Sequence, residues 1–135
     1  MNPTMKDKGL QVTKTLPNGA AAVTTTAIDL GHNTTGQFLA QCELLIESPL
    51  LDVTDLANAA TLKFDIVSSA NADLSSPTIV AQAVMTQTGA GGVGAAAQSV
   101  RFRPATDSQR YVGVRATNSG AGDISDKSVT VSLVF

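Results

Sequence analysis

The strongest constraint on the fold is an alternation of apolar and polar residues that recurs in short runs along the chain. The clearest run is TLKFDIVS at residues 61–68, where Leu62, Phe64 and Ile66 share one face. Successive side chains of a strand point to opposite faces, so this run predicts a strand with one buried face. The last residues, SVTVSLVF, repeat the pattern and predict a strand that runs to Phe135.

Similar runs predict about eight short strands, at residues 10–15, 22–29, 37–47, 61–68, 78–86, 98–103, 109–117 and 128–135. The run 37–47 also fits a helix because Leu45 interrupts its polar face, but its alternation favours a strand. Turn-forming residues at 17–19, 69–77 and 118–123 separate the runs, and residues 52–60 could hold a short helical turn. This pattern predicts an all-β protein, an antiparallel sandwich or barrel. We expect one domain, residues 1–135, with residues 1–16 as a candidate extended N-terminal arm.

Composition narrows the classes of function. Charged residues make up 15% of the chain, against about 25% in a typical domain, and the net charge is -2. Such sparse charge argues against a nucleic-acid-binding protein and against a disordered chain. The sequence has neither a signal-peptide pattern nor an apolar stretch of the roughly 20 residues that a membrane helix needs. We therefore expect synthesis in a cytoplasm and no membrane partner.

A glycine-rich segment, GAGGVGAAA at residues 89–97, contains the spacing Gly-x-Gly-x-x-Gly. A dinucleotide-binding loop of this spacing needs a long helix directly after the glycines, and then a parallel strand that carries an acidic residue. Here the chain passes within a few residues into the alternating run QSVRFR, which ends at Pro104. The segment therefore predicts a mobile hairpin loop and not a phosphate-binding loop.

Residues that could carry chemistry are few. His32 and Cys42 are the single histidine and the single cysteine, and they could form a nucleophile pair with Asp29 as its orienting group. The neighbours of Cys42 on its face are apolar, which is typical of a buried structural cysteine. A structural zinc site is excluded, because one Cys and one His leave two of its four usual ligands missing. Asp123 and Asp126 fit a capped turn better than a calcium site. We expect no enzyme activity, no cofactor and no metal.

Four arginines lie close together in the sequence: Arg101, Arg103, Arg110 and Arg115. On neighbouring strands they could form a docking face, because arginine is enriched at protein interfaces. The simpler interpretation is a solvated outer face of a sheet. Nucleic acid is disfavoured as a partner, because Tyr111 is the single aromatic residue between Arg103 and Arg115 that could stack on bases.

Three stretches carry a family resemblance: AVTTTAIDLG at residues 22–31, KFDIVSSANADLSSP at 63–77 and QRYVGVRATNSGAGDISDKSVTVSLVF at 109–135. Together they resemble the capsid cement (decoration) proteins of tailed bacteriophages, of the Bordetella-phage type. The resemblance implies a jelly-roll sandwich that forms a small homo-oligomer, a dimer or alternatively a trimer. It also implies a place on the capsid exterior, where the protein clamps neighbouring subunits of the major capsid protein.

We therefore expect a virion structural protein that is made in the bacterial host cytoplasm and stabilises the shell. Its candidate capsid or oligomer contacts are Met5, Lys6, Lys8, Leu10, Arg101, Arg103, Arg110 and Arg115. One alternative is a carbohydrate-binding sandwich on a virion, although a chain with no Trp and a single Tyr is poorly equipped to stack on sugars. A second alternative is a small hydrolase that uses Cys42 or His32.

Overall fold

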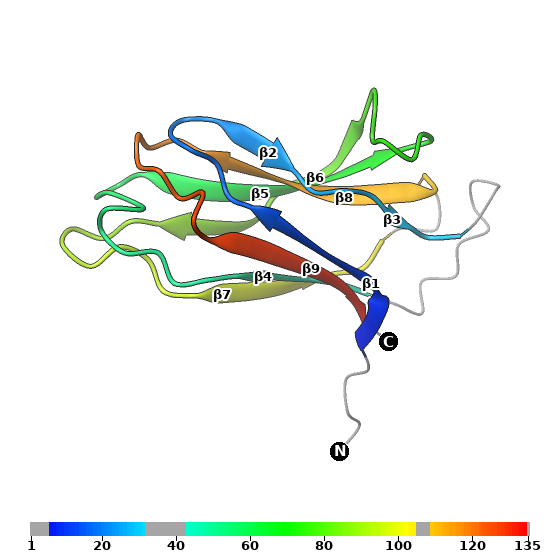
Figure 1. Ribbon diagram of the computed structural model, residues 1–135, viewed down its shortest axis with the longest axis horizontal. Helices are drawn as coiled ribbons and strands as arrows, with labels where there is room; N and C mark the ends of the chain where they lie inside the picture. The colour runs from blue at the N-terminus through cyan, green and yellow to red at the C-terminus, as the bar shows by residue number, and fades with distance from the viewer. Residues whose placement is uncertain (1–5, 32–42, 105–108, 135) are drawn as a thin grey trace, which may run out of the picture.

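In the computed structural model, which describes residues 6–31, 43–104 and 109–134, nine strands form two antiparallel sheets packed face to face (Figure 1). For residues 6–10 the structure describes the backbone alone. The strands are β1 (Lys6–Thr15), β2 (Ala22–Thr24), β3 (Ile28–Asp29), β4 (Glu43–Ser48), β5 (Thr61–Ser69), β6 (Thr78–Thr88), β7 (Gln98–Phe102), β8 (Tyr111–Asn118) and β9 (Ser128–Val134). No helix in these ranges is long and apolar enough to cross a membrane.

The strand order is that of a jelly roll. One sheet has the order β1-β9-β4-β7, and the other has the order β2-β8-β5-β6 with β3 also paired to β8. Because β2 and β3 both lie beside β8, the nine strands fill eight positions, four in each sheet. Each sheet thus combines early and late parts of the chain, as in the double-sheet folds built from two Greek keys. The predicted all-β, antiparallel, jelly-roll-like sandwich is confirmed.

The core lies between the sheets and contains the faces that the alternation predicts. In β5 the side chains of Leu62, Phe64 and Ile66 are buried, whereas Lys63 is exposed. The same holds for the apolar faces of β8 and β9, whose buried residues include Val112, Val114, Ala116, Val129, Val131 and Leu133. Leu45 lies on the opposite face of β4 and is buried as well, so alternation alone does not determine burial in the four-stranded sheet.

Residues 22–29, expected as one strand, are divided by a bulge. Thr24 pairs with Arg115 and Ile28 with Val112, so the outer strand has one extra residue between these pairs. Thr25 fills the gap: its backbone N–H donates to the carbonyl of Val114 at 3.0 Å, and its hydroxyl accepts from the N–H of Val114 at 3.1 Å. The alternation of apolar and polar residues could not predict this bulge, because it depends on a hydrogen bond from the backbone of Val114 to the side chain of Thr25.

Other boundaries also shift. β1 begins at Lys6, so most of the predicted arm is an edge strand of the sheet. The predicted helical turn within 52–60 is a single bond from the N–H of Leu56 to the carbonyl of Asp52, at 2.9 Å. Residues 37–42 of one predicted strand, and Phe135 at the end of another, lie outside the described residues.

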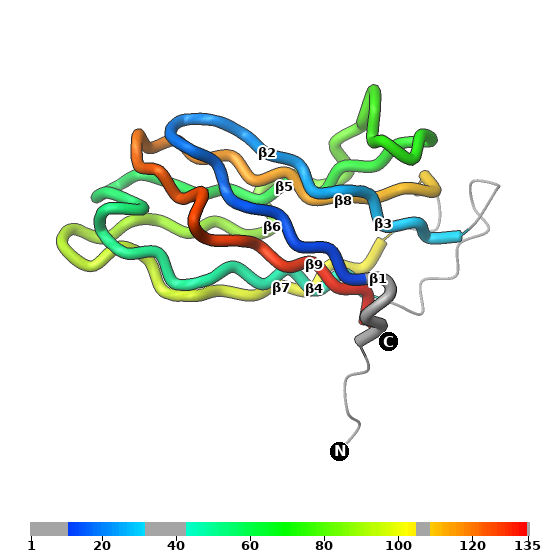
Figure 2. Tube along the Cα trace, in the orientation of Figure 1, coloured from blue at the N-terminus to red at the C-terminus, as the bar shows by residue number. Residues whose placement is uncertain are grey.

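Four connections cross from one sheet to the other at the same end of the sandwich, at the left of Figures 1 and 2. They are residues 16–21, 49–60, 89–97 and 119–127, and we call them together the loop end. Thr15 pairs with Ser128 beside the loop end, whereas Lys6 pairs with Val134 at the far end of the same two strands. The strand order therefore gathers four loops from distant parts of the sequence into one region.

Candidate interaction surface

Each loop of the loop end is anchored by an apolar side chain in the core. Leu16, Leu51 and Ile124 are at most 1% exposed, and Ala95 is 8% exposed. All four belong to the same hydrophobic cluster as the inward faces of the strands. Because a loop that loses its anchor exposes apolar surface, burial holds each loop against the sandwich.

Backbone hydrogen bonds join the loops to one another. Leu51 and Ala95 exchange two N–H to carbonyl bonds of 2.9 and 2.7 Å, which link residues 49–60 to 89–97. Gly19 donates its N–H to the carbonyl of Gly122 at 3.0 Å and links residues 16–21 to 119–127. These bonds satisfy backbone groups that loops usually leave to water.

The glycine-rich segment packs tightly against its neighbour. A Cβ atom on Gly89 would lie 2.0 Å from the carbonyl oxygen of Ala57, and one on Gly94 would lie 2.1 Å from that of Leu51. Gly94 also has a φ of +71°, a region that side-chain-bearing residues rarely adopt. The prediction of a mobile hairpin loop is therefore corrected: the segment crosses between sheets, and two of its glycines permit close backbone contact.

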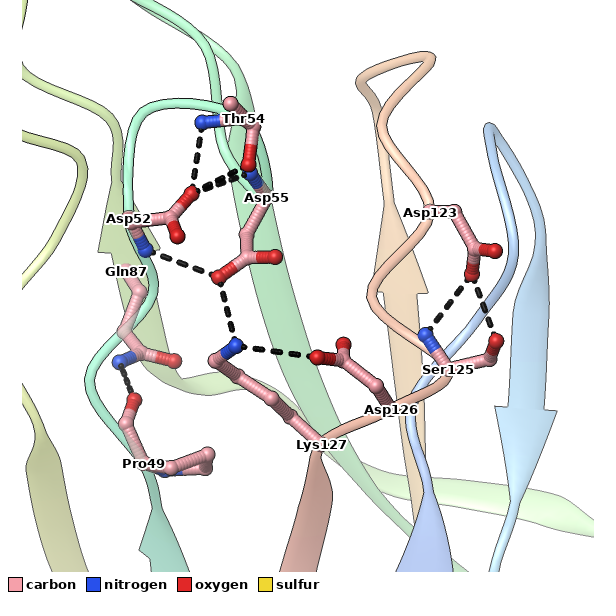
Figure 3. Close-up of polar contacts among 9 residues, drawn as sticks. All are labelled: Pro49, Asp52, Thr54, Asp55, Gln87, Asp123, Ser125, Asp126 and Lys127. Atoms are coloured by element: carbon pink, nitrogen blue, oxygen red, sulfur yellow. Dashed lines mark hydrogen bonds and ion pairs between the residues drawn. The ribbon is translucent and has the colours of Figure 1, made fainter.

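The side chain of Gln87 binds both residues 49–60 and residues 89–97. This side chain is fully buried at the end of β6. The amide nitrogen donates to the carbonyls of Pro49 at 3.0 Å and Ala96 at 2.9 Å, and the amide oxygen accepts a 2.6 Å bond from the Ser48 hydroxyl. Figure 3 shows the contact with Pro49. All polar atoms of this buried amide are used, so it acts as a fixed clamp between the loops.

An ion pair connects residues 49–60 to 119–127 (Figure 3). The carboxylate of Asp55 is almost entirely buried, and its Oδ2 accepts from the N–H of Asp52 at 2.9 Å and from Lys127 Nζ at 3.0 Å. Lys127 Nζ also lies 3.4 Å from Asp126 Oδ2. The hydrogen bond with Asp55 is the main cause that raises the pKa of Lys127, so the ammonium stays charged and bound.

Two further carboxylates cap turns on the outside of these loops. Asp52 Oδ1 accepts from the hydroxyl and the N–H of Thr54, at 2.6 and 2.7 Å, and Asp123 Oδ1 accepts from the hydroxyl and N–H of Ser125, at 2.6 and 2.9 Å. These bonds, from the hydroxyls above all, hold the pKa of each carboxyl below its usual 3.8. The predicted capped turn at Asp123 is confirmed. The described ranges contain no group of three or more His, Cys, Asp or Glu residues that could hold a metal.

Two loops of the loop end expose large apolar side chains. Leu50, Val53 and Val93 are 58%, 41% and 72% exposed, and they are three of the five exposed large hydrophobic residues in the described ranges. The sequence interpretation did not include them among its candidate contacts. An apolar residue inside a segment of turn-forming residues, such as Val53 between Asp52 and Thr54, is the signal that could have found them.

The predicted arginine face does not exist as one surface. Arg101 lies on β7 and Arg103 directly follows it, in the four-stranded sheet, whereas Arg115 lies on β8 and Arg110 directly precedes it, in the five-stranded sheet. The consecutive strands β7 and β8 are thus in opposite layers. Arg103 is 67% exposed and its NH2 lies 4.0 Å from Glu43 Oε1.

Arg110 and Arg115 form hydrogen-bonded ion pairs within the chain. Arg110 forms a bidentate pair with Asp29, at 2.8 and 2.9 Å, and this hydrogen bonding raises the pKa of the guanidinium further. Arg115 NH2 lies 3.1 Å from Asp65 Oδ2, and the Asp65 side chain is 6% exposed. Tyr111 is half-buried, and the guanidinium carbon of Arg110 lies 5.2 Å from its ring centroid. One face of this ring is therefore covered by Arg110.

The remaining predicted contacts that fall in the described residues lie on β1. β1, an edge strand of the four-stranded sheet, carries all three of them: Lys6, Lys8 and Leu10. Lys6 pairs with Val134, at the end of the sandwich opposite the loop end. Three residues singled out from the sequence lie outside the described residues: Met5, His32 and Cys42.

Fold and surface together define a jelly-roll sandwich with a hydrogen-bonded loop end that exposes three large apolar side chains. A scan against protein-family models finds no match, and a search of the curated proteins finds none either.

Proposed function

We propose that this chain is a virion structural protein that binds the outer surface of an assembled capsid and cements neighbouring subunits of the major capsid protein. The observation that carries the proposal is the loop end, which combines exposed apolar side chains with a backbone fixed by anchors and hydrogen bonds. Such a surface suits contact with another protein, because little conformational freedom is lost on binding.

Two further observations support the proposal. The jelly roll is an architecture that viral capsid proteins use, although the same architecture also occurs in lectins. Three stretches, at residues 22–31, 63–77 and 109–135, resemble tailed-phage cement proteins of the Bordetella-phage type. On this proposal the chain is made in the bacterial host cytoplasm and acts on the capsid exterior as a small homo-oligomer, a dimer or alternatively a trimer.

The mechanism is stabilisation by mass action. A protein that binds the assembled shell and not its separated subunits shifts the equilibrium toward the shell, by about 2.7 kcal/mol per site at a free concentration of 100 times Kd. Each bound copy that contacts two neighbouring capsid subunits must be displaced before these subunits separate. No covalent chemistry, cofactor or metal is needed for this role.

The test is to heat particles that lack this protein, with and without the purified chain added back, and to follow release of their nucleic acid. We expect the added chain to raise the rupture temperature, and an unrelated protein at the same concentration to leave it unchanged. Identical rupture temperatures would overturn the proposal. Unchanged rupture temperatures together with binding on a glycan array would favour the carbohydrate-binding alternative.

A further inference from the structure

The three exposed apolar residues of the loop end lie around one backbone contact. A Cβ atom on Gly94 would lie 2.1 Å from the Leu51 carbonyl oxygen and 2.4 Å from the Asp52 carbonyl carbon, so these backbones touch. Leu50 and Val53 flank this pair on one loop, and Val93 precedes Gly94 on the other. The same two loops also expose five alanines, at positions Ala57, Ala59, Ala90, Ala96 and Ala97. Asp52, between Leu51 and Val53, is also exposed, so one carboxylate adjoins these apolar residues. Exposed apolar side chains grouped in this way are typical of the middle of a protein interface.

This apolar surface is also held in place before any partner arrives. Leu51 and Ala95 anchor its two loops in the core, and Gln87 binds the carbonyls of both loops. Loops that carry exposed hydrophobic residues and are also fixed lose little entropy when a partner covers them. A loop that only connects two strands would need neither exposed hydrophobic residues nor a fixed backbone.

The charge around the surface is acidic. The four segments of the loop end carry four carboxylates and one ammonium group, a net charge of -3, whereas the whole chain carries -2. The ammonium of Lys127 is held by Asp55 and Asp126. Asp52, Asp123 and Asp126 are exposed, so carboxylates border the apolar centre. Because charges across an interface are complementary, the matching surface carries lysine or arginine.

We infer that the loop end is the surface by which this chain binds its partner, a protein surface with an apolar centre bordered by lysine and arginine side chains. This inference rests on the function proposed above, and its partner is then the capsid subunit. It places the contact away from the arginines and from the Lys6 end of β1. Contact at these four loops also leaves both sheet faces free of the capsid.

The experiment measures Kd by co-sedimentation of the purified chain with capsid shells assembled without it. Replacing Leu50 and Val93 together by Ser should weaken binding at least tenfold, because it removes the apolar centre. Asp126→Lys should weaken binding severalfold, and raised salt should weaken wild-type binding. The matched controls are Ile79→Ser with Val80→Ser, which are also exposed but lie on β6, and Asp73→Lys in the loop between β5 and β6. We expect the controls to bind within about twofold of the wild type.

The outcomes distinguish an error in the inferred binding surface from an error in the proposed function. If the wild type binds shells and the Leu50/Val93 variant binds equally well, the surface is wrong while the proposed function stands. If the wild type does not bind shells, the proposed function fails and the inference with it. If the variant instead dissociates a wild-type oligomer in sedimentation equilibrium and still binds shells, the loop end joins copies of this chain, which also overturns the inference. Urea unfolding of each variant verifies that it is folded.

Discussion

Gly94 lies where two loop backbones approach too closely for a side chain. We expect Gly94→Ala to lower the free energy of unfolding by about 2–4 kcal/mol. Part of this loss comes from the positive φ, which costs alanine about 1 kcal/mol, and the rest from displacement of the Leu51 and Asp52 backbone. Urea unfolding at pH 7 measures the loss.

Gly92 provides the control for this prediction. Its φ is +82°, but a Cβ atom there would meet no atom within 4 Å. Gly92→Ala should therefore lose only the conformational part, about 1 kcal/mol. Equal losses in the two variants would mean that the Gly94 contact with residues 51–52 is absent.

Asp52 is one of two carboxylates, with Asp123, through which acid should act on the loop end. Its pKa is lowered from 3.8 in the folded chain, so its contribution to stability is complete above about pH 4 and is lost as the pH falls through the folded pKa. The Thr54 hydroxyl is the largest cause, so Thr54→Val should raise the pKa of Asp52 toward 3.8 and reduce this acid sensitivity. Carboxyl NMR titration measures the pKa of Asp52 in the wild type and in the variant. The control variant Thr13→Val, on β1, should leave the pKa of Asp52 and the acid sensitivity unchanged. An Asp52 that titrates at or above 3.8 in the wild type contradicts the capped turn.

At the scale of elements, strand β6 ends in the clamp that positions two loops. Gln87→Met keeps the side-chain length but leaves the carbonyls of Pro49 and Ala96 and the Ser48 hydroxyl without their partner. Because unsatisfied buried polar groups are costly, we expect a loss of roughly 2–4 kcal/mol. The amides of Leu51 and Ala95 should also exchange hydrogen faster, as measured by NMR.

Gln82 is the matched control, because it lies on the same strand and is exposed. Gln82→Met should change the free energy of unfolding by less than about 0.5 kcal/mol. If hydrogen exchange at Leu51 and Ala95 is as slow in Gln87→Met as in this control, Gln87 does not hold the loops.

The elements also mark how far the sequence can predict this fold. Alternation identified the strands and their buried faces, because a half-buried strand must place apolar residues at every second position. It could not assign strands to sheets: β7 and β8 follow one another in the sequence, yet they lie in opposite layers, which divides the predicted arginine face. It also could not place Leu50, Val53 and Val93 in one region, because the two loops that carry them are brought together only by the strand order.

At the scale of the whole molecule, the strand order makes the last strand indispensable. β9 lies between β1 and β4 and pairs with both. We expect a chain that ends at Lys127 to show no cooperative unfolding transition, because β1 loses the strand with which it pairs and β4 loses one of its two. Circular dichroism during urea titration tests this. Leu133→Ala in the full-length chain should lose only about 2–5 kcal/mol. A truncated chain with near-normal stability would contradict the position of β9.

The register of β1 on β9 also determines where other sequences can be attached. Lys6 and Val134 are paired, and Thr15 and Ser128 at the other ends of the same strands lead into the loop end. Lys6 and Val134 therefore lie side by side at the end of the sandwich opposite the loop end. Under the binding mode inferred above, a fluorescent protein or an antigen fused beyond either residue would attach at the end opposite the bound surface. The Lys6–Val134 pair thus marks the place to attach cargo for display.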